Sequence, residues 1–563
     1  MGIFSCIVND PDFAELICRD IMNNGCSVAQ AIANYQAGKI YQGVLHSLPS
    51  VEDSRIEIES IFNQLSFGGR EEVFHRLITD YPGPTALLTE DMSVAESMAL
   101  PPNIIRGLLT RAGGPTSHLF IGPKARGIHC LYGLHSNYDR VRDGDVIAID
   151  GLNRKIIVNP DEDTLLRIRQ MAHNYNALHI QAQKRFRFKN PCISGAAGKG
   201  KRQIVVIRGN VASEWECKEM VGFGLNEAGL FRTELADMTG KDGVLREAPK
   251  TEDELVAYYG RLYYGTLVES VVERTADNRP EKPLPGYRPI TPGTGLSLEG
   301  IGLSLAYRYP PDNLPGDVSK ESFKPFDDYF CIQLRALLRV SGMFPGRSKI
   351  EFPYVQNYQE WRRAHEFLAE IKKGLRKEKK KFDPNLKEGV MVEVPWLVGD
   401  ELRCVMLEAD FASFGGNDML RNFFHIDRDV PLADVLQKAY DPEFIKLLGE
   451  SIKIVNEVAR GRRRKISYQG CGEMSSDLLL IPIQIGLGLY EFSVSPPKAP
   501  IIKYLINSLY LRDLRDILIP RVLEATNSTT ARRQAVETYR ELQRRNHFPK
   551  GRFFNELLKS AES

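Results

Sequence analysis

The feature that most constrains the fold is a regular alternation of short apolar segments and amphipathic segments that begins at about residue 203. Eight candidate strands follow one another: QIVVIRGN, AGLFR, ESVVERTA, KIEFPYV, EGVMVEV, FASFGG, KISYQG and LYEFSVS. Helical patterns such as EDELVAYYGRLYYGTL separate most of them. Eight strand–helix units over roughly 300 residues predict a (β/α)8 TIM barrel in an α/β protein. An open doubly wound sheet is the alternative, but no dinucleotide-binding glycine fingerprint accompanies the repeats.

The rest of the chain divides by its residue pattern. Since 563 residues are too many for one hydrophobic core, two or three domains are expected. Helical spacing over 1–80 predicts a partial helical subdomain, and short apolar runs between Gly, Asp, Asn and Pro predict an α/β domain over 81–160. A polar helical pattern predicts a linker helix within 161–200, followed by the barrel over 201–545 and a C-terminal tail over 546–563.

Composition excludes several classes of protein. The net charge of +2 indicates no general attraction to nucleic acid. The nine cysteines show no paired spacing such as C-x-x-C, which favours free thiols in a reducing compartment. No signal-peptide pattern and no apolar run of roughly 20 residues is present, so neither secretion nor membrane insertion is predicted. We therefore expect a cytoplasmic protein.

Polar residues end five of the predicted barrel strands. They are Arg232, Arg274, Glu393, Asn417 with Asp418, and Cys471. In TIM barrels the carboxyl ends of the strands form the active site. Arginine binds phosphate or carboxylate with two parallel hydrogen bonds, and carboxylates together with substrate oxygens suit Mg²⁺. Each residue alone is better explained as an ordinary ion pair, but five strand ends together predict a site for a small phosphorylated acid and a metal ion.

A second group of polar residues follows a tight loop. Gly113, Gly114 and Pro115 force the turn, and Thr116, Ser117 and His118 come directly after it. The backbone N–H groups of a strand-to-helix junction can receive an anion, and imidazole is a competent phosphoryl nucleophile at neutral pH. The residues alone leave two interpretations of His118 open, a structural histidine and a phosphoryl acceptor.

Several segments resemble motifs of the phosphoenolpyruvate-utilising enzyme family, and among its members those of phosphoenolpyruvate–protein phosphotransferases, Enzyme I of the bacterial sugar phosphotransferase system. They are GGPTSHLFIGPKARGIHCLYG, GLNEAGLFRTELADM, VVERTADNRPEKPLPGY, GVMVEVP, FASFGGNDMLRNFFHIDR and GCGEMSSD. The resemblance runs from about residue 3 to about residue 510 in family order. It implies a swivelling phosphohistidine domain before the barrel, and a first subdomain that docks a carrier protein.

The resemblance also implies a role for each matched residue. His118 would be phosphorylated on Nε2, and Cys471 would protonate the enolpyruvate carbon. Phosphoenolpyruvate would be held by Arg232, Arg274, Asn417, Asp418 and Arg428. The metal, Mg²⁺, would be bound by Glu393 and Asp418. The phosphoryl group would pass to a histidine phosphocarrier protein similar to HPr, and the enzyme would be a homodimer.

The sequence departs from the family pattern in several places. LEGIGLSLAYR puts Ser304 where a substrate-binding arginine is usual, Gly416 replaces a threonine, and Glu351 replaces a methionine. The family's first strand and opening helices also have no counterpart, so we interpret the N-terminal part as shortened. Ser304→Arg is therefore expected to raise activity, unless Arg308 reaches into the site instead.

Two other functions are compatible with these motifs. One is a catalytically impaired paralogue with a regulatory or binding role, which the departures favour and the retained motif residues oppose. The other is a pyruvate phosphate dikinase or phosphoenolpyruvate synthase, for whose nucleotide-binding domain this chain has no room.

Overall fold

The computed structural model describes the chain from residue 84 to residue 562. The gaps are 91, 93–96, 98–99, 101–103, 112–119, 121–122, 124–127, 152–154, 196–201, 234–250, 265, 279–298, 312–317, 427–429, 431 and 463–465. The chain divides into two compact units. The first contains 1–145 with 237–248 and 283–291, and the second contains the remainder. The helical subdomain predicted for 1–80 lies outside the described residues.

The first unit contains a small parallel sheet. Its strands β1 (Thr85–Thr89), β2 (Ile105–Thr110) and β3 (His129–Leu131) lie in the order β1-β2-β3. Leu108 of β2 is fully buried in a small core with Phe120. This sheet agrees with the α/β character that the short apolar runs predict.

A hairpin and a long helix precede the barrel in the second unit. Strands β4 (Ile147–Asp150) and β5 (Lys155–Val158) pair antiparallel, and α9 (Glu162–Phe186) follows them. Asp161 caps α9 by accepting a hydrogen bond from the backbone N–H of Thr164 at 2.8 Å. This helix lies in the predicted linker. The exact limits of the predicted domains stay predictions.

Eight parallel strands close into a barrel, which confirms the predicted fold class. They are β8 (Val206–Val211), β9 (Glu227–Arg232), β10 (Ser270–Arg274), β11 (Ser348–Phe352), β12 (Lys387–Val392), β13 (Phe411–Gly415), β14 (Ser467–Cys471) and β15 (Glu491–Val494). They pair in chain order, and β15 closes the barrel on β8. Each strand lies within one of the eight segments that the sequence predicts or overlaps it.

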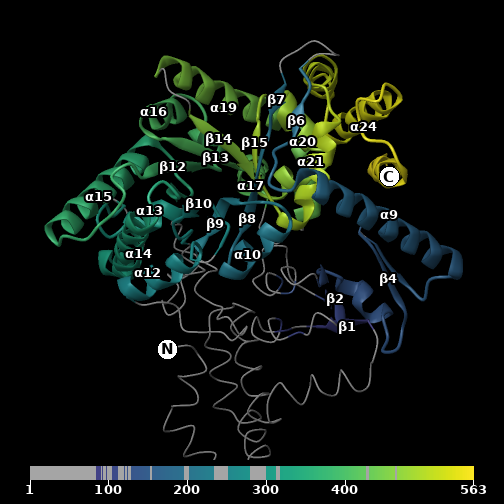
Figure 1. Cartoon of the computed structure of the whole chain (residues 1–563), viewed down its shortest axis with the longest axis horizontal. Coiled ribbons are helices and arrows are strands. Elements are labelled where there is room, and N and C mark those ends of the chain that lie inside the picture. Colours follow the sequence, from purple (N-terminus) through teal and green to yellow (C-terminus); the bar gives the residue numbers. More distant parts are fainter. Residues whose placement is uncertain are drawn as a thin grey trace, which may run out of the picture. The chain divides into compact units, whose positions relative to one another are not determined.

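Helices cover the outside of the barrel (Figure 1). Among them are α10 (Glu214–Gly222), α12 (Glu252–Arg261), α14 (Lys324–Met343), α15 (Tyr358–Lys377), α16 (Asp400–Glu408), α17 (Gly416–Phe424), α19 (Pro442–Gly461) and α21 (Ala499–Asn507). On α15 the buried residues include Trp361, Ala364 and Leu368, spaced three and four apart, so one face of this helix packs on the barrel. Among the described helices, none is long and apolar enough to cross a membrane.

The residues predicted to form a C-terminal tail instead form a packed helix. After α24 (Ser528–Arg544), the helix α25 (Arg552–Glu562) buries Phe554 and Leu558 completely. The ring of Phe553 lies 5.2 Å from that of Tyr175 on α9. Aromatic pairs of this kind stabilise packing beyond the area they bury. Residues 552–562 therefore belong to the core of the second unit.

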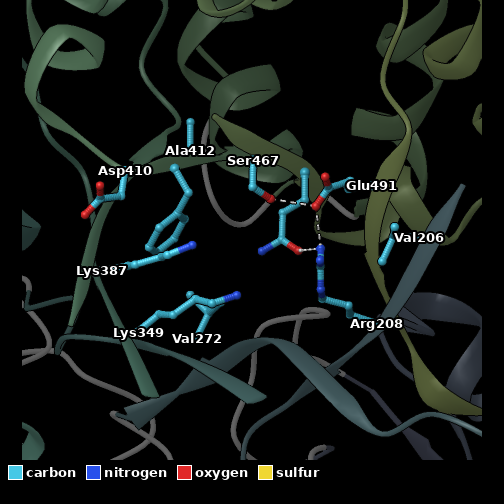
Figure 2. A pocket seen from close by; sticks show the side chains of 11 residues that line it. Val206, Arg208, Val272, Lys349, Lys387, Asp410, Ala412, Ser467 and Glu491 are labelled. Atoms are coloured by element: carbon cyan, nitrogen blue, oxygen red, sulfur yellow. Dashed lines mark hydrogen bonds and ion pairs between the residues drawn. The ribbon is translucent and has the colours of Figure 1, made fainter. Parts of the chain in front are cut away.

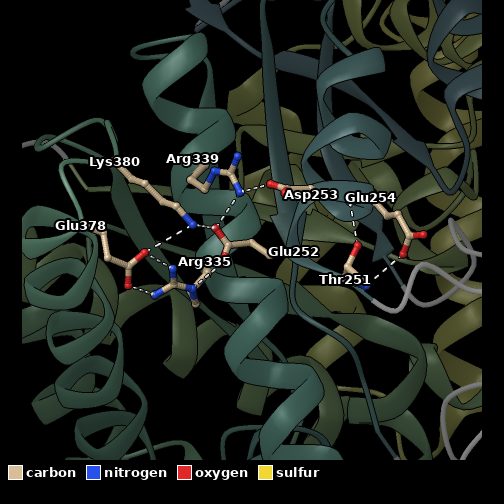
Figure 3. Close-up of polar contacts among 8 residues, drawn as sticks. All are labelled: Thr251, Glu252, Asp253, Glu254, Arg335, Arg339, Glu378 and Lys380. Carbon is tan, nitrogen blue, oxygen red and sulfur yellow. Dashed lines mark hydrogen bonds and ion pairs between the residues drawn. The ribbon is translucent and has the colours of Figure 1, made fainter.

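An ion-pair network ties three of the outer helices together (Figure 3). Glu252 in the first turn of α12 accepts hydrogen bonds from Arg335 and Arg339 of α14 and, at 3.0 Å, from Lys380 after α15. Arg335 also contacts Glu378 at 2.6 Å. Burial would raise the pKa of Glu252, but the hydrogen bonds from the three cations outweigh it and lower the pKa from 4.5 to about 2.

We expect Glu252→Gln to lower the free energy of unfolding at pH 7 by about 1–3 kcal/mol, because several partly buried cations lose their shared carboxylate. A depressed folded-state pKa stabilises the fold above the unfolded value of 4.5, and this stability is lost as pH falls toward about 2. Urea unfolding at pH 7 and at pH 3 tests this, and the difference from the wild type should shrink at pH 3.

The control for that measurement is Asp253→Asn. Asp253 contacts Arg339 at 2.5 Å, but its side chain is 84% exposed. An exposed ion pair contributes little, so this variant should change stability by less than about 0.5 kcal/mol. Equal losses for the two variants would contradict a special role for Glu252.

Candidate active site

Two arginines lie side by side at the carboxyl end of the barrel. Arg232 ends β9 and Arg274 ends β10, and the two residues are direct partners in the pairing of these strands. Arg274 is nearly buried and forms an ion pair with Asp277 at 3.5 Å. Two guanidinium groups at one level of the barrel can hold two anionic groups of one small molecule.

Buried hydrogen bonds fix the backbone that follows these arginines. Thr233 donates its hydroxyl hydrogen to the Arg274 carbonyl at 2.7 Å, and Gln333 donates to the Thr233 hydroxyl at 2.9 Å. Gln333 also accepts the N–H of Ala276 at 3.0 Å. A buried amide with partners on both of its ends holds the loop after β10 in one conformation.

Two carboxylates lie next on the same rim. Glu393 follows β12 and is 1% exposed, and Asp418 lies in the first turn of α17. Burial raises the pKa of Glu393 well above its ordinary value, and the negative charges of Asp418 and Asp277 raise it further. Arg274 and a backbone hydrogen bond oppose that rise only in part. Two neighbouring carboxylates of which one is buried are a favourable environment for a divalent cation.

The orientation of Glu393 is set by the neighbouring strand. Its Oε1 accepts the N–H of Tyr354, which lies just beyond β11, at 2.7 Å. Asn422 of α17 donates to the Glu393 carbonyl at 3.0 Å and accepts the Tyr354 hydroxyl at 3.2 Å. These contacts hold one carboxylate oxygen against the protein and orient the whole side chain.

Asn417 is held by the loop after β14. Its side-chain oxygen accepts the N–H of Glu473 at 3.0 Å. Gly472 has a φ of +83°, and a Cβ there would lie 2.9 Å from the same oxygen of Asn417, so only glycine fits. Gly416 is similarly close to Met474, since its Cβ would lie 3.2 Å from that of Met474. Gly416, which replaces the family's threonine, therefore packs closely against Met474.

Cys471 is a buried thiol at the end of β14. It is 3% exposed, and its Sγ lies 3.3 Å from the carbonyl oxygen of Phe414 and 3.5 Å from the sulfur of Met391. Burial raises the pKa of this thiol well above its ordinary value, and the charges of Glu351 and Glu393 add to the rise. The thiol is therefore protonated at neutral pH and can act as a proton donor.

Glu351 lies inside the barrel beside these groups. It is fully buried on β11 as the strand partner of Arg274. Burial raises its pKa to about 7, although Ser413 and the positive charge of Arg274 each lower it. Among the described residues, neither of its carboxylate oxygens forms a hydrogen bond. With a pKa of about 7 it is partly ionised near neutral pH, and its negative charge adds to the rise of the Cys471 pKa.

Ser304 and Arg308 have structural partners. Ser304 is fully buried on α13 (Gly300–Leu305), where its hydroxyl accepts from Asn278 and donates to the Gly300 carbonyl, each at 3.0 Å. Arg308 forms an ion pair with Asp327 at 2.5 Å and stacks on the ring of Phe367 at 3.9 Å. Arg308 is thus engaged on the outer helices, and the buried hydroxyl of Ser304 is hydrogen-bonded on both sides.

Contrary to the expectation from the sequence, we therefore expect Ser304→Arg to destabilise the protein rather than to activate it. Overpacking and a buried charge should lower the free energy of unfolding by about 2 kcal/mol or more. Ser304→Ala, which only removes the hydroxyl, should cost about 1 kcal/mol. Thermal unfolding of both variants tests this; an unchanged melting temperature for Ser304→Arg would show that the arginine finds space.

The structure brings together Arg232, Arg274, Glu393, Asn417, Asp418 and Cys471 at one end of one barrel. His118 and Arg428 lie outside the described residues. The sequence analysis assigned no roles to Asp277, Tyr354 and Asn422, although Asp277 lies in the segment VVERTADNRPEKPLPGY, which resembles a family motif. Among the described residues, no three His, Cys, Asp or Glu side chains form a metal site.

Comparison with known families agrees with this geometry. Residues 196–511 match the PEP-binding domain of PEP-utilising enzymes, and residues 81–154 match the mobile domain of the same enzymes. The first match alone spans more than half of the chain, so the chain belongs to the PEP-utilising enzyme family. The predicted resemblance and the predicted enzyme class, a phosphotransferase, are confirmed.

Individual relatives are distant but similar over most of their length. The chain is 26% identical to the phosphoenolpyruvate-protein phosphotransferase of Staphylococcus aureus over 522 residues, which are 91% of this chain and 82% of the relative. It is 27% identical to the protein of the same name from Staphylococcus epidermidis over 452 residues, 79% of this chain and 72% of the relative. The Priestia megaterium protein is 28% identical over 413 residues, 73% of this chain and 64% of the relative.

Proposed function

We propose that the protein transfers a phosphoryl group from phosphoenolpyruvate to His118 and then to a histidine phosphocarrier protein similar to HPr, releasing pyruvate. The observation that carries this proposal is the strand register that sets Arg232 beside Arg274, with Glu393 and the Cys471 thiol on the same rim. Phosphoenolpyruvate has a phosphate, a carboxylate and a carbon that must gain a proton. The rim offers a group of matching chemistry for each.

The arginines supply the binding of the substrate. The guanidinium groups of Arg232 and Arg274 each offer a fork of N–H donors for a phosphate or carboxylate. Their positive charges also face the oxygens that gain charge during transfer, in a barrel end where Arg274 is nearly buried. Asn417 and Arg428 complete the substrate contacts by resemblance to the family.

Glu393 and Asp418 are the residues that would hold Mg²⁺. The fit rests on the burial of Glu393 and on the charge of Asp418 beside it, which both oppose the ionisation of Glu393 and would be offset by a divalent cation. When bound, the ion would neutralise both carboxylates and polarise the oxygens of the substrate. The N–H of Tyr354 occupies one oxygen of Glu393 and so leaves the other for the ion.

Cys471 supplies the proton that completes the reaction. As the phosphorus–oxygen bond of phosphoenolpyruvate breaks and a phosphorus–nitrogen bond to His118 forms, the leaving enolate keeps the electron pair. Its methylene carbon then takes the thiol proton, which gives pyruvate and a thiolate that water reprotonates. The elevated pKa of the thiol keeps the proton in place until the enolate, a strong base, forms.

The mobile domain and the oligomer belong to the same proposal. His118 lies within residues 81–154, which match the family's mobile domain, and it would carry the phosphoryl group from the barrel to the carrier. By the same family resemblance, the protein would act as a homodimer. The second candidate function, a catalytically impaired paralogue with a regulatory or binding role, is favoured by Ser304, a buried and hydrogen-bonded serine where the family usually has an arginine.

His118 is expected to carry the phosphoryl group alone. Incubation with radiolabelled phosphoenolpyruvate and Mg²⁺ should give acid-labile, base-stable phosphate on the wild type and none on His118→Ala. His129→Ala changes an exposed histidine of β3 and should keep the label. Label on His118→Ala would contradict the assignment, and an unlabelled wild type would favour the regulatory alternative.

Glu393 is expected to set the metal requirement. Glu393→Gln should raise the Mg²⁺ concentration for half-maximal pyruvate release by about tenfold or more, because one anionic ligand is lost. The matched control is Glu388→Gln on the same strand, whose carboxylate contacts His365 and Lys372, each at 2.6 Å. An unchanged metal requirement in Glu393→Gln would show that the ion binds elsewhere.

A further inference from the structure

A polar cavity lies at the amino-terminal end of the barrel strands. It has a volume of about 320 Å³, and its charged lining residues are Arg208, Lys349, Lys387, Asp410 and Glu491. Each lies at or just before the amino-terminal half of its strand, whereas the candidate active site is formed by the carboxyl ends. We refer to this space as the amino-end cavity. In TIM barrels, residues at this end ordinarily serve stability.

Two lysines direct their charge into the amino-end cavity. Lys349 of β11 and Lys387 of β12 are direct partners in the pairing of these strands. Figure 2 shows both ammonium groups directed into the cavity toward the side of Arg208. Among the described residues, neither ammonium forms an ion pair. Both lysines and Arg208, which does form ion pairs, line the same cavity.

The carboxylates at the cavity form hydrogen bonds with groups other than the two lysines. Glu491 contacts Arg208 at 2.7 Å and accepts the Ser467 hydroxyl at 2.6 Å. Glu227 contacts Arg208 from the other side at 2.6 Å. Asp410 accepts the backbone N–H of Glu388 at 3.1 Å, and in Figure 2 its carboxylate points away from the lysines. Glu227 and Glu491 thus form their ion pairs with Arg208, and among the described residues no carboxylate forms an ion pair with either lysine.

The two lysine charges lie close enough to oppose each other. Like charges at directly paired positions of neighbouring strands repel each other. Burial lowers the pKa of Lys349, and the positive charges of Arg208 and Lys387 lower it further, whereas Glu227 and Glu491 act in the opposite direction. Lys387 is exposed and Lys349 is half-buried, and both ammonium groups are directed into the cavity (Figure 2).

We propose that the amino-end cavity binds a small organic or inorganic dianion, held between the ammonium groups of Lys349 and Lys387. A volume of about 320 Å³ is that of a site for a small metabolite rather than a nucleotide. Phosphate monoesters and short dicarboxylates share the required chemistry, which is two negative charges on a compact group. The apolar wall made by Val206, Val272 and Ala412 would contact the carbon part of such a ligand. This site is independent of the proposed phosphotransfer, because it uses other residues at the opposite end of the strands.

The test is calorimetric titration of the full chain with inorganic phosphate and, separately, with malonate. Phosphate will also bind the arginines of the candidate active site, so Arg232→Gln is used to remove that contribution. In the Arg232→Gln background we expect one remaining site for at least one of the two ions, whose dissociation constant rises tenfold or more in Lys349→Gln/Lys387→Gln. The two ions distinguish a phosphate ligand from a dicarboxylate.

The control removes the same charge elsewhere. Lys373→Gln/Lys377→Gln lies on the exposed face of α15 and should leave the affinity unchanged. Lys387→Gln alone changes an exposed residue and keeps the experiment decisive if the double variant does not fold. Lys349→Arg/Lys387→Arg should retain binding. The proposal would be overturned if Arg232→Gln alone and Arg232→Gln combined with Lys349→Gln/Lys387→Gln bound the ions equally well. It would also be overturned if neither ion bound to Arg232→Gln.

Discussion

The register of the eight paired strands is the constraint on which the rest of this structure depends. Side chains alternate along a strand, so pairing decides which of them face the inside of the barrel at a given level. It sets Arg232 beside Arg274 at one end and Lys349 beside Lys387 at the other. A slip of one residue would exchange inward and outward side chains on a whole strand and dissolve both groups.

The sequence predicts most of this because barrel strands leave a strong signal. Each is an apolar run bounded by turn residues, and the polar residue that ends it is visible as a break, as for Arg232 and Cys471. The supports of the site are not visible in this way. Tyr354 holds Glu393 with a backbone N–H, which carries no residue identity at all. Its role exists only once β11 and β12 lie side by side.

Other differences have the same origin in tertiary contacts. The spacing of Ser304 and Arg308 on one helical segment allows Arg308 to reach the site, but Asp327 on α14 holds it outside. Residues 546–563 are predicted to form a C-terminal tail, yet residues 552–562 form a helix of the core in which Phe553 contacts Tyr175 on α9. In both cases the contact is made with a partner far away in sequence.

Each end of the barrel holds two side chains of like charge close together, carboxylates at the carboxyl end and lysines at the amino end. At the carboxyl end, Glu393 is buried beside Asp418, and burial together with that charge opposes its ionisation. At the amino end, burial lowers the pKa of Lys349, and the positive charges of Arg208 and Lys387 lower it further, against Glu227 and Glu491. Neither pair favours the fold by itself, and each would become favourable on binding the group of opposite charge that we propose for it. The closed sheet and its large hydrophobic core can hold both pairs in place, since their geometry is fixed by strand pairing rather than by attraction between the side chains.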